Sequence, residues 1–239
     1  RDVRGRAVEW VLLTTLGLTL LILIALIVSL LDRAWPVLDG RLGDFLSSGL
    51  DASNAKEAGV WQAIRGTITL AVIVMVVSFP LGIACAVYLE EYARRSRLAR
   101  IIRINVRNLA GVPSIVYGIL GLTIFVKFAG DITGGRTVIA GGLTLSVLML
   151  ALSRAAGEAA PLLLVGGITG LLRTGNQGLW EQITKGGFTS MPVAIFSYAR
   201  QTGVDFQAVT AAASLILLLL VIVINGLAIW LRNRFERNW

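Results

Sequence analysis

Histidine is missing from the 239-residue sequence, and cysteine occurs once, at Cys85. Without histidine the chain lacks the commonest general base, every Ser-His-Asp or Cys-His arrangement and any Cys/His metal site. One cysteine excludes a disulfide within the chain, and its place in an apolar run predicts that Cys85 is a small buried hydrophobe. The sequence therefore argues against most enzyme classes and predicts no metal site.

Charged residues are also scarce, because they make up 15% of the chain against 56% hydrophobic residues. A soluble domain of this length needs more polar surface, so lipid must cover much of the exterior. The net charge of +8 raises nucleic acid as a partner, but the arginines stand in short clusters beside apolar runs, and no basic face is interleaved with aromatics. We therefore predict an all-α polytopic membrane protein that contacts lipid and not nucleic acid.

Four apolar runs have the length of a membrane-spanning helix, and they cover residues 10–31, 68–89, 109–128 and 208–231. The first run follows a basic segment, so a signal peptide is an alternative. It is too long for a typical signal sequence, however, and no A-x-A site follows it, which favours an uncleaved span. Six arginines between Arg94 and Arg107 place the loop after the second run in the cytoplasm.

The apolar stretch 137–172 is too long for one span and too short for two spans joined by a turn. Basic residues near both ends of the chain favour cytoplasmic termini, so the number of spans is even and this stretch supplies two of them. Two spans here need a cytoplasmic connector, and none is present. We therefore predict one transmembrane domain over 1–239 with six helices, from which a cytoplasmic segment is missing near residues 147–152.

Arg154 and Glu158 lie four residues apart inside that stretch, so their side chains share one face of a helix and can pair. Ionised side chains at membrane depth usually face a bundle interior or an aqueous cavity. One interpretation is a structural ion pair between helices. The other is a transport pathway, in which the guanidinium attracts an anion through two parallel hydrogen bonds and the carboxylate keeps binding weak. We favour the pathway.

Pro113 and Ser114 stand near the start of a glycine-rich segment, NLAGVPSIVYGILGL. A proline there can bend or break the helix, and small residues permit close contact between helices. An ordinary kinked helix and a pathway-lining helix both fit this pattern, and we include Ser114 as a pathway candidate. No G-x-x-x-x-G-K-[ST] loop occurs in the chain, so ATP-driven transport would need an ATPase on another chain.

Three segments resemble the PstA group of phosphate permeases from ABC importers: LEEYARRSRLARIIRINVRNLAGVPSIVYGILGL, LSRAAGEAAPLLLVG, and FTSMPVAIFSYARQ together with the LRNRFERNW tail. The EEYA start and the LRNRF tail favour this group over its partner group, PstC. The resemblance implies the type I ABC importer permease fold, also called MetI-like, in the bacterial inner membrane. It also implies a PstC-like second permease, two PstB-like ATPase subunits that bind ATP and Mg, and a periplasmic PstS-like phosphate-binding protein.

The same resemblance implies roles for the R-A-x-G-E residues, Arg154 and Glu158 here, in phosphate passage. The family also carries a cytoplasmic coupling segment of the EAA type between its fourth and fifth spans, whereas this sequence passes from TLSVLML directly into ALSRAAGE. That gap coincides with the connector required on physical grounds. The expected function is a phosphate importer permease, and the alternatives are a permease for another anion or small nutrient, or a membrane sensor or scaffold without its own pathway.

Overall fold

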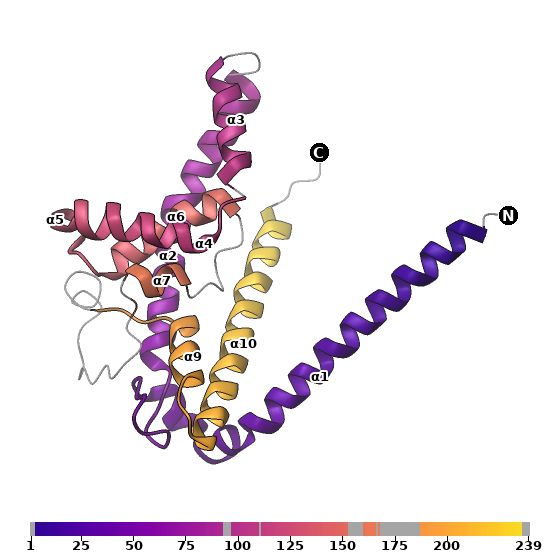
Figure 1. The fold of residues 1–239 in the computed structure, drawn as a ribbon, viewed down its shortest axis with the longest axis vertical. Coiled ribbons are helices and arrows are strands. Elements are labelled where there is room, and N and C mark those ends of the chain that lie inside the picture. Colours follow the sequence, from indigo (N-terminus) through magenta and orange to yellow (C-terminus); the bar gives the residue numbers. More distant parts are fainter. Residues whose placement is uncertain are drawn as a thin grey trace. The chain divides into compact units, whose positions relative to one another are not determined.

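The computed structural model describes residues 3–92, 97–109, 111–152, 160–165, 167 and 187–235. Every regular element within these ranges is a helix, which confirms the predicted all-α class (Figure 1). The chain divides into two compact units. One contains residues 1–42 and 203–239, and the other contains residues 43–202.

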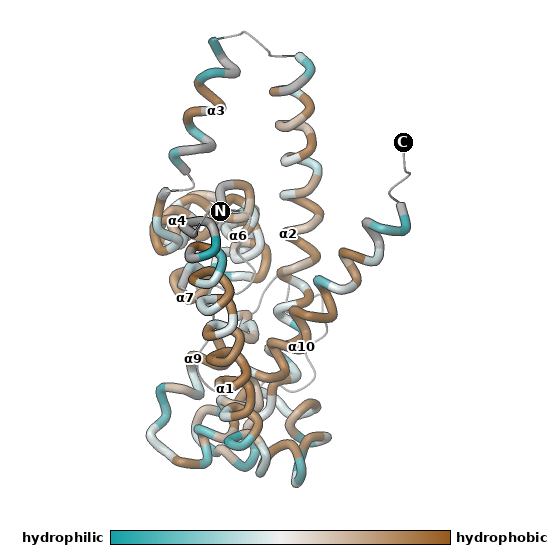
Figure 2. Tube along the Cα trace, turned by 90° about the vertical axis from the view of Figure 1, so that its right-hand side faces the viewer, coloured by the Kyte–Doolittle hydropathy of each residue, from teal (hydrophilic) through white to brown (hydrophobic). Residues whose placement is uncertain are grey.

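Three helices are long and apolar enough to cross a membrane, and they cover Val8–Ser47, Trp61–Val87 and Val204–Trp230. They contain nearly all of the predicted spans 10–31, 68–89 and 208–231. The first and last belong to helices α1 (Val3–Ser47) and α10 (Val204–Phe235), along which apolar residues follow one another (Figure 2). These three spans need no tertiary context to be recognised, because an uninterrupted apolar run of membrane length is itself the signal.

Helix α1 is longer than the apolar run that predicted it. It continues from Leu31 to Ser47, beyond the end of the apolar run 10–31. Pro36 lies inside this continuation, and Arg41 has φ −153° and ψ 30°, so a kink joins two helical stretches there.

The second unit begins with the end of α1. Next come α2 (Trp61–Val87), the π-helical η1 (Tyr88–Tyr92) and α3 (Arg97–Leu109). Its remaining elements are α4 (Ser114–Gly121), the π-helical η2 (Leu122–Phe128), α5 (Gly130–Thr133), α6 (Val138–Leu152), α7 (Ala160–Val165) and α9 (Met191–Ala199). The apolar helices Ser114–Phe128 and Val138–Leu150 are shorter than a full span. Six spans therefore remain a prediction.

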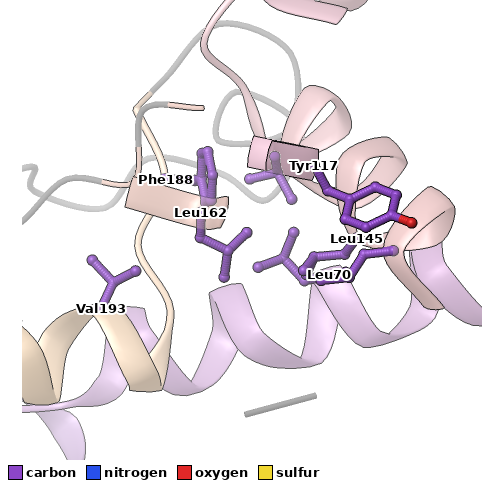
Figure 3. Close-up of a cluster of buried hydrophobic side chains, with 8 residues drawn as sticks. Leu70, Tyr117, Leu145, Leu162, Phe188 and Val193 are labelled. Atoms are coloured by element: carbon purple, nitrogen blue, oxygen red, sulfur yellow. The ribbon is translucent and has the colours of Figure 1, made fainter. Parts of the chain in front are cut away.

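A cluster of buried apolar side chains holds the second unit together, with α2 packed on α6 and α4 packed on both α6 and α7 (Figure 3). The buried members are Leu70, Tyr117, Val138, Leu145, Leu148, Leu162, Phe188 and Val193. They come from five helices and from the segment before α9, so distant parts of the sequence share one core. Close van der Waals packing within this cluster positions the short helices, because lipid is as apolar as the core and burial from water contributes little between membrane helices.

Helices α2 and α6 approach each other closely at a glycine. A Cβ atom on Gly142 would lie 2.5 Å from Cγ2 of Ile73, closer than real Cβ contacts occur, so a larger residue would force the two helices or the Ile73 side chain to shift. Nearby, the buried hydroxyl of Ser78 donates a hydrogen bond of 3.1 Å to the carbonyl oxygen of Ser146. On the same α2 helix Cys85 is only half-buried, in contrast to the full burial expected from the sequence.

Candidate functional site

Arg154 and Glu158 lie between α6 and α7, outside the described residues. Their role in a pathway therefore stays a prediction. The structure does describe the neighbouring elements, because α6 ends at Leu152 and α7 begins at Ala160. Residues 147–152, where we predicted a missing connector, form the continuous end of α6.

Ser114 is the first residue of α4 and follows Pro113, which has φ −56° and ψ 140°. Residues 111–113 are not helical, so the helix is broken at the proline, one of the two outcomes that the sequence allowed. The backbone N–H of Val116 donates to the carbonyl oxygen of Pro113 at 3.0 Å and closes the first turn of α4. Ser114 itself is half-buried, and its predicted place on a pathway remains a prediction.

Helix α4 fixes α7 at a second close glycine contact. A Cβ atom on Gly118 would lie 2.8 Å from the Cα atom of Pro161 and 2.8 Å from Cδ1 of Leu164. The glycine-rich segment thus permits the close helix contact that its composition predicts. This contact positions α7, which begins two residues after Glu158.

A polar pair that the sequence interpretation missed lies at the amino end of α9. Thr189 and Ser190 are 3% and 1% exposed. Neither hydroxyl oxygen has a hydrogen-bond partner within the described part of the chain. Two sequence signals mark this helix start: a serine in the capping position and a proline in the first turn, at Pro192.

Helix α9 is tied to α2 and to the loop before α2. The backbone N–H of Met191 donates to Oγ1 of Thr67 at 2.8 Å, and the hydroxyl of Tyr198 donates to the carbonyl oxygen of Gly59 at 2.6 Å. Six of the nine helix residues are buried: Met191, Pro192, Val193, Ala194, Ser197 and Tyr198.

Comparison with known proteins places the chain among membrane permeases. The phosphate transport system permease protein PstA of Yersinia pestis is 28% identical over 73% of this chain and 72% of its own length. PstC of Mesorhizobium japonicum is 35% identical over 48% of this chain and 36% of its own length. PstA 1 of Mycobacterium tuberculosis is 37% identical over 42% of this chain and 32% of its own length. The chain is a relative of the PstA and PstC permeases. The resemblance seen in the sequence is therefore confirmed.

No family model and no solved structure matches the chain. Except for the Yersinia protein, the relatives named above match over about a third of their own length. The alignment with the Yersinia PstA is 222 positions long but takes in only 73% of the 239 residues here. Several dozen of its positions therefore have no counterpart in this chain. The missing cytoplasmic segment remains a prediction.

Proposed function

We propose that this chain is a permease subunit of an ATP-driven importer of inorganic phosphate and that it forms half of the translocation pathway. It lies in the bacterial inner membrane with both termini in the cytoplasm. Its partners are a second PstC-like permease, two PstB-like ATPase subunits and a periplasmic PstS-like phosphate-binding protein. ATP and Mg bind to the ATPase subunits, so this chain holds no cofactor of its own.

The observation that carries the proposal is the similarity to PstA over most of this chain, together with three helices of membrane length. The sequence contains no loop for ATP phosphates, so an importer built on it must take its energy from a separate subunit. The arginine clusters beside the apolar runs support cytoplasmic termini.

In this proposal Arg154 attracts the phosphate anion, and Glu158 limits how tightly the anion is held. A guanidinium matches two phosphate oxygens, while a carboxylate one helical turn away repels the dianion. Weak attraction suits a pathway, because a substrate that binds tightly is released slowly. Ser114 adds a hydroxyl near the start of α4.

The test is uptake of radiolabelled phosphate by cells that lack their own phosphate permease and express this chain with its partner subunits. We expect Arg154→Gln to abolish most uptake at unchanged protein abundance. The matched control is Arg136→Gln, which removes an exposed arginine outside the proposed pathway. Equal uptake by both variants would refute the pathway role of Arg154.

Two results would point to another function. If sulfate or molybdate competes with phosphate as well as unlabelled phosphate does, the substrate is a broader class of anions. If the wild-type assembly moves no labelled phosphate but changes the cell's response to phosphate starvation, the chain is a sensor or scaffold.

A further inference from the structure

The hydroxyls of Thr189 and Ser190 are unusual, because they are buried among apolar helices and have no hydrogen-bond partner among the described residues. Buried polar groups in proteins almost always have a hydrogen-bond partner, and a buried hydroxyl without one costs free energy. Here two adjacent hydroxyls, both more than nine-tenths buried, lack partners among the described residues. Two buried hydroxyls without protein partners are therefore candidates to bind a ligand that accepts their hydrogen bonds.

The helix that follows adds a positive partial charge at the same place. Helix α9 has nine residues, and its amino end carries no side-chain cap. Ser190 holds the capping position with φ −146° and ψ 164°, yet its hydroxyl does not close onto the helix. The N–H of Met191 already donates to Thr67, and Pro192 has no N–H, so this helix start attracts an anion mainly through the positive end of its dipole.

Two glycines hold this segment in position. A Cβ atom on Gly66 of α2 would collide with the carbonyl oxygen of Thr189, and a Cβ atom on Gly141 of α6 would lie 2.7 Å from the ring of Phe188. Phe188 and Val193, on either side of the hydroxyl pair in the sequence, both belong to the buried cluster (Figure 3). The hydroxyls are therefore fixed by packing on both sides.

The amino end of α9 contacts α2 at the start of its apolar run. Its Met191 N–H is bonded to Thr67, which lies about 9 Å from Trp61 along the helix axis and directly before the run 68–89. The carboxyl end of α9 is followed by the exposed Arg200. Transporters use short helices whose positive ends point into the membrane to hold anionic groups of a substrate.

We propose that Thr189, Ser190 and the amino end of α9 form an oxyanion-binding site for phosphate on its route through the subunit. This inference rests on the proposed function. The donors are the two hydroxyls, which carry no full positive charge, and this suits transient binding and release. Both hydroxyls are covered in the described conformation, so phosphate reaches them in another state of the transport cycle.

The test combines two measurements on the double variant Thr189→Val, Ser190→Ala in the full chain with its partner subunits. Each replacement removes a hydroxyl with little change in volume. We expect the KM for phosphate uptake to rise at least about tenfold, because hydrogen bonds to a charged ligand are lost. Thermal stability without phosphate should rise, because the unpaired groups are gone. Thr189→Ser in place of Thr189→Val should recover part of the lost affinity.

Ser78→Ala is the matched control, since it removes a buried hydroxyl that is already bonded within the protein. It should lower thermal stability and leave KM unchanged. An unchanged KM in the double variant would overturn the site while leaving the proposed function intact. So would a loss of stability with unchanged KM, which would mean that the hydroxyls hold only a structural water. Absence of phosphate uptake in the wild type would overturn both proposals.

Discussion

The close contact between α4 and α7 gives a quantitative prediction for Gly118→Ala. The added methyl would lie 2.8 Å from the Cα atom of Pro161, which is backbone and cannot rotate away. It would also lie 2.8 Å from Cδ1 of Leu164, a flexible group that can move. Relief of the first contact requires α4 and α7 to separate, and that separation exposes the apolar cluster that includes Leu162.

The magnitude follows from comparison with Gly17→Ala in α1, where no atom lies within 4 Å of the new methyl. Both changes gain the same helix preference of alanine over glycine, so that gain cancels in the difference. What remains is the cost of overpacking, about 1–3 kcal/mol in well-packed cores. We expect Gly118→Ala to be less stable than Gly17→Ala by this amount.

Equilibrium unfolding of the purified chain in mixed micelles, at increasing fractions of sodium dodecyl sulfate, measures this difference. Loss of helical circular dichroism reports unfolding, and Gly118→Ala should unfold at a clearly lower detergent fraction. Equal midpoints for the two variants would show that α7 does not pack on α4 at Gly118, and the argument for this helix pair would fail.

Two further predictions concern α9. Tyr198→Phe removes the 2.6 Å hydrogen bond to the buried carbonyl of Gly59, so it should cost about 1–2 kcal/mol of stability, measured by thermal unfolding; an unchanged melting temperature would contradict the contact. Thr67→Cys with Met191→Cys, in a Cys85→Ser background, should form a disulfide, since the 2.8 Å contact keeps the two Cα atoms within about 7 Å. Oxidation should stop phosphate uptake and reduction should restore it; uptake by the oxidised form would show that α9 stays on α2 throughout transport.

The sequence was sufficient for the long helices but not for the short ones. The runs 10–31, 68–89 and 208–231 are recognisable from length and hydropathy alone, and the structure places each almost entirely within a helix of membrane length. The break at Pro113 was equally predictable, because proline restricts the residue before it and lacks an N–H donor. Local chemistry determines these features.

Helix α9 shows what local patterns cannot supply. No pattern within its segment SMPVAIFSYARQ predicts that six of the nine helix residues are buried. Burial depends on partners far away in the sequence: Thr67 bonds to Met191, and Gly59 bonds to Tyr198. The unpartnered hydroxyls of Thr189 and Ser190 could not be predicted for the same reason. Whether a hydroxyl has a hydrogen-bond partner depends on the residues packed around it, and these are distant in the sequence. The pathway roles of Arg154, Glu158 and Ser114 remain predictions.

The glycines show which helices have open space around them and which are in tight contact with another segment. Gly17 in α1 and Gly226 in α10 have open space where a methyl would go, as expected for helices that face lipid. Gly66 instead meets the backbone of Thr189, so a larger residue there would force the segment before α9 away from α2. In the proposal above, phosphate reaches the covered hydroxyls only when the segment before α9 moves. This tight contact with α2 is therefore the one that we expect to separate during transport.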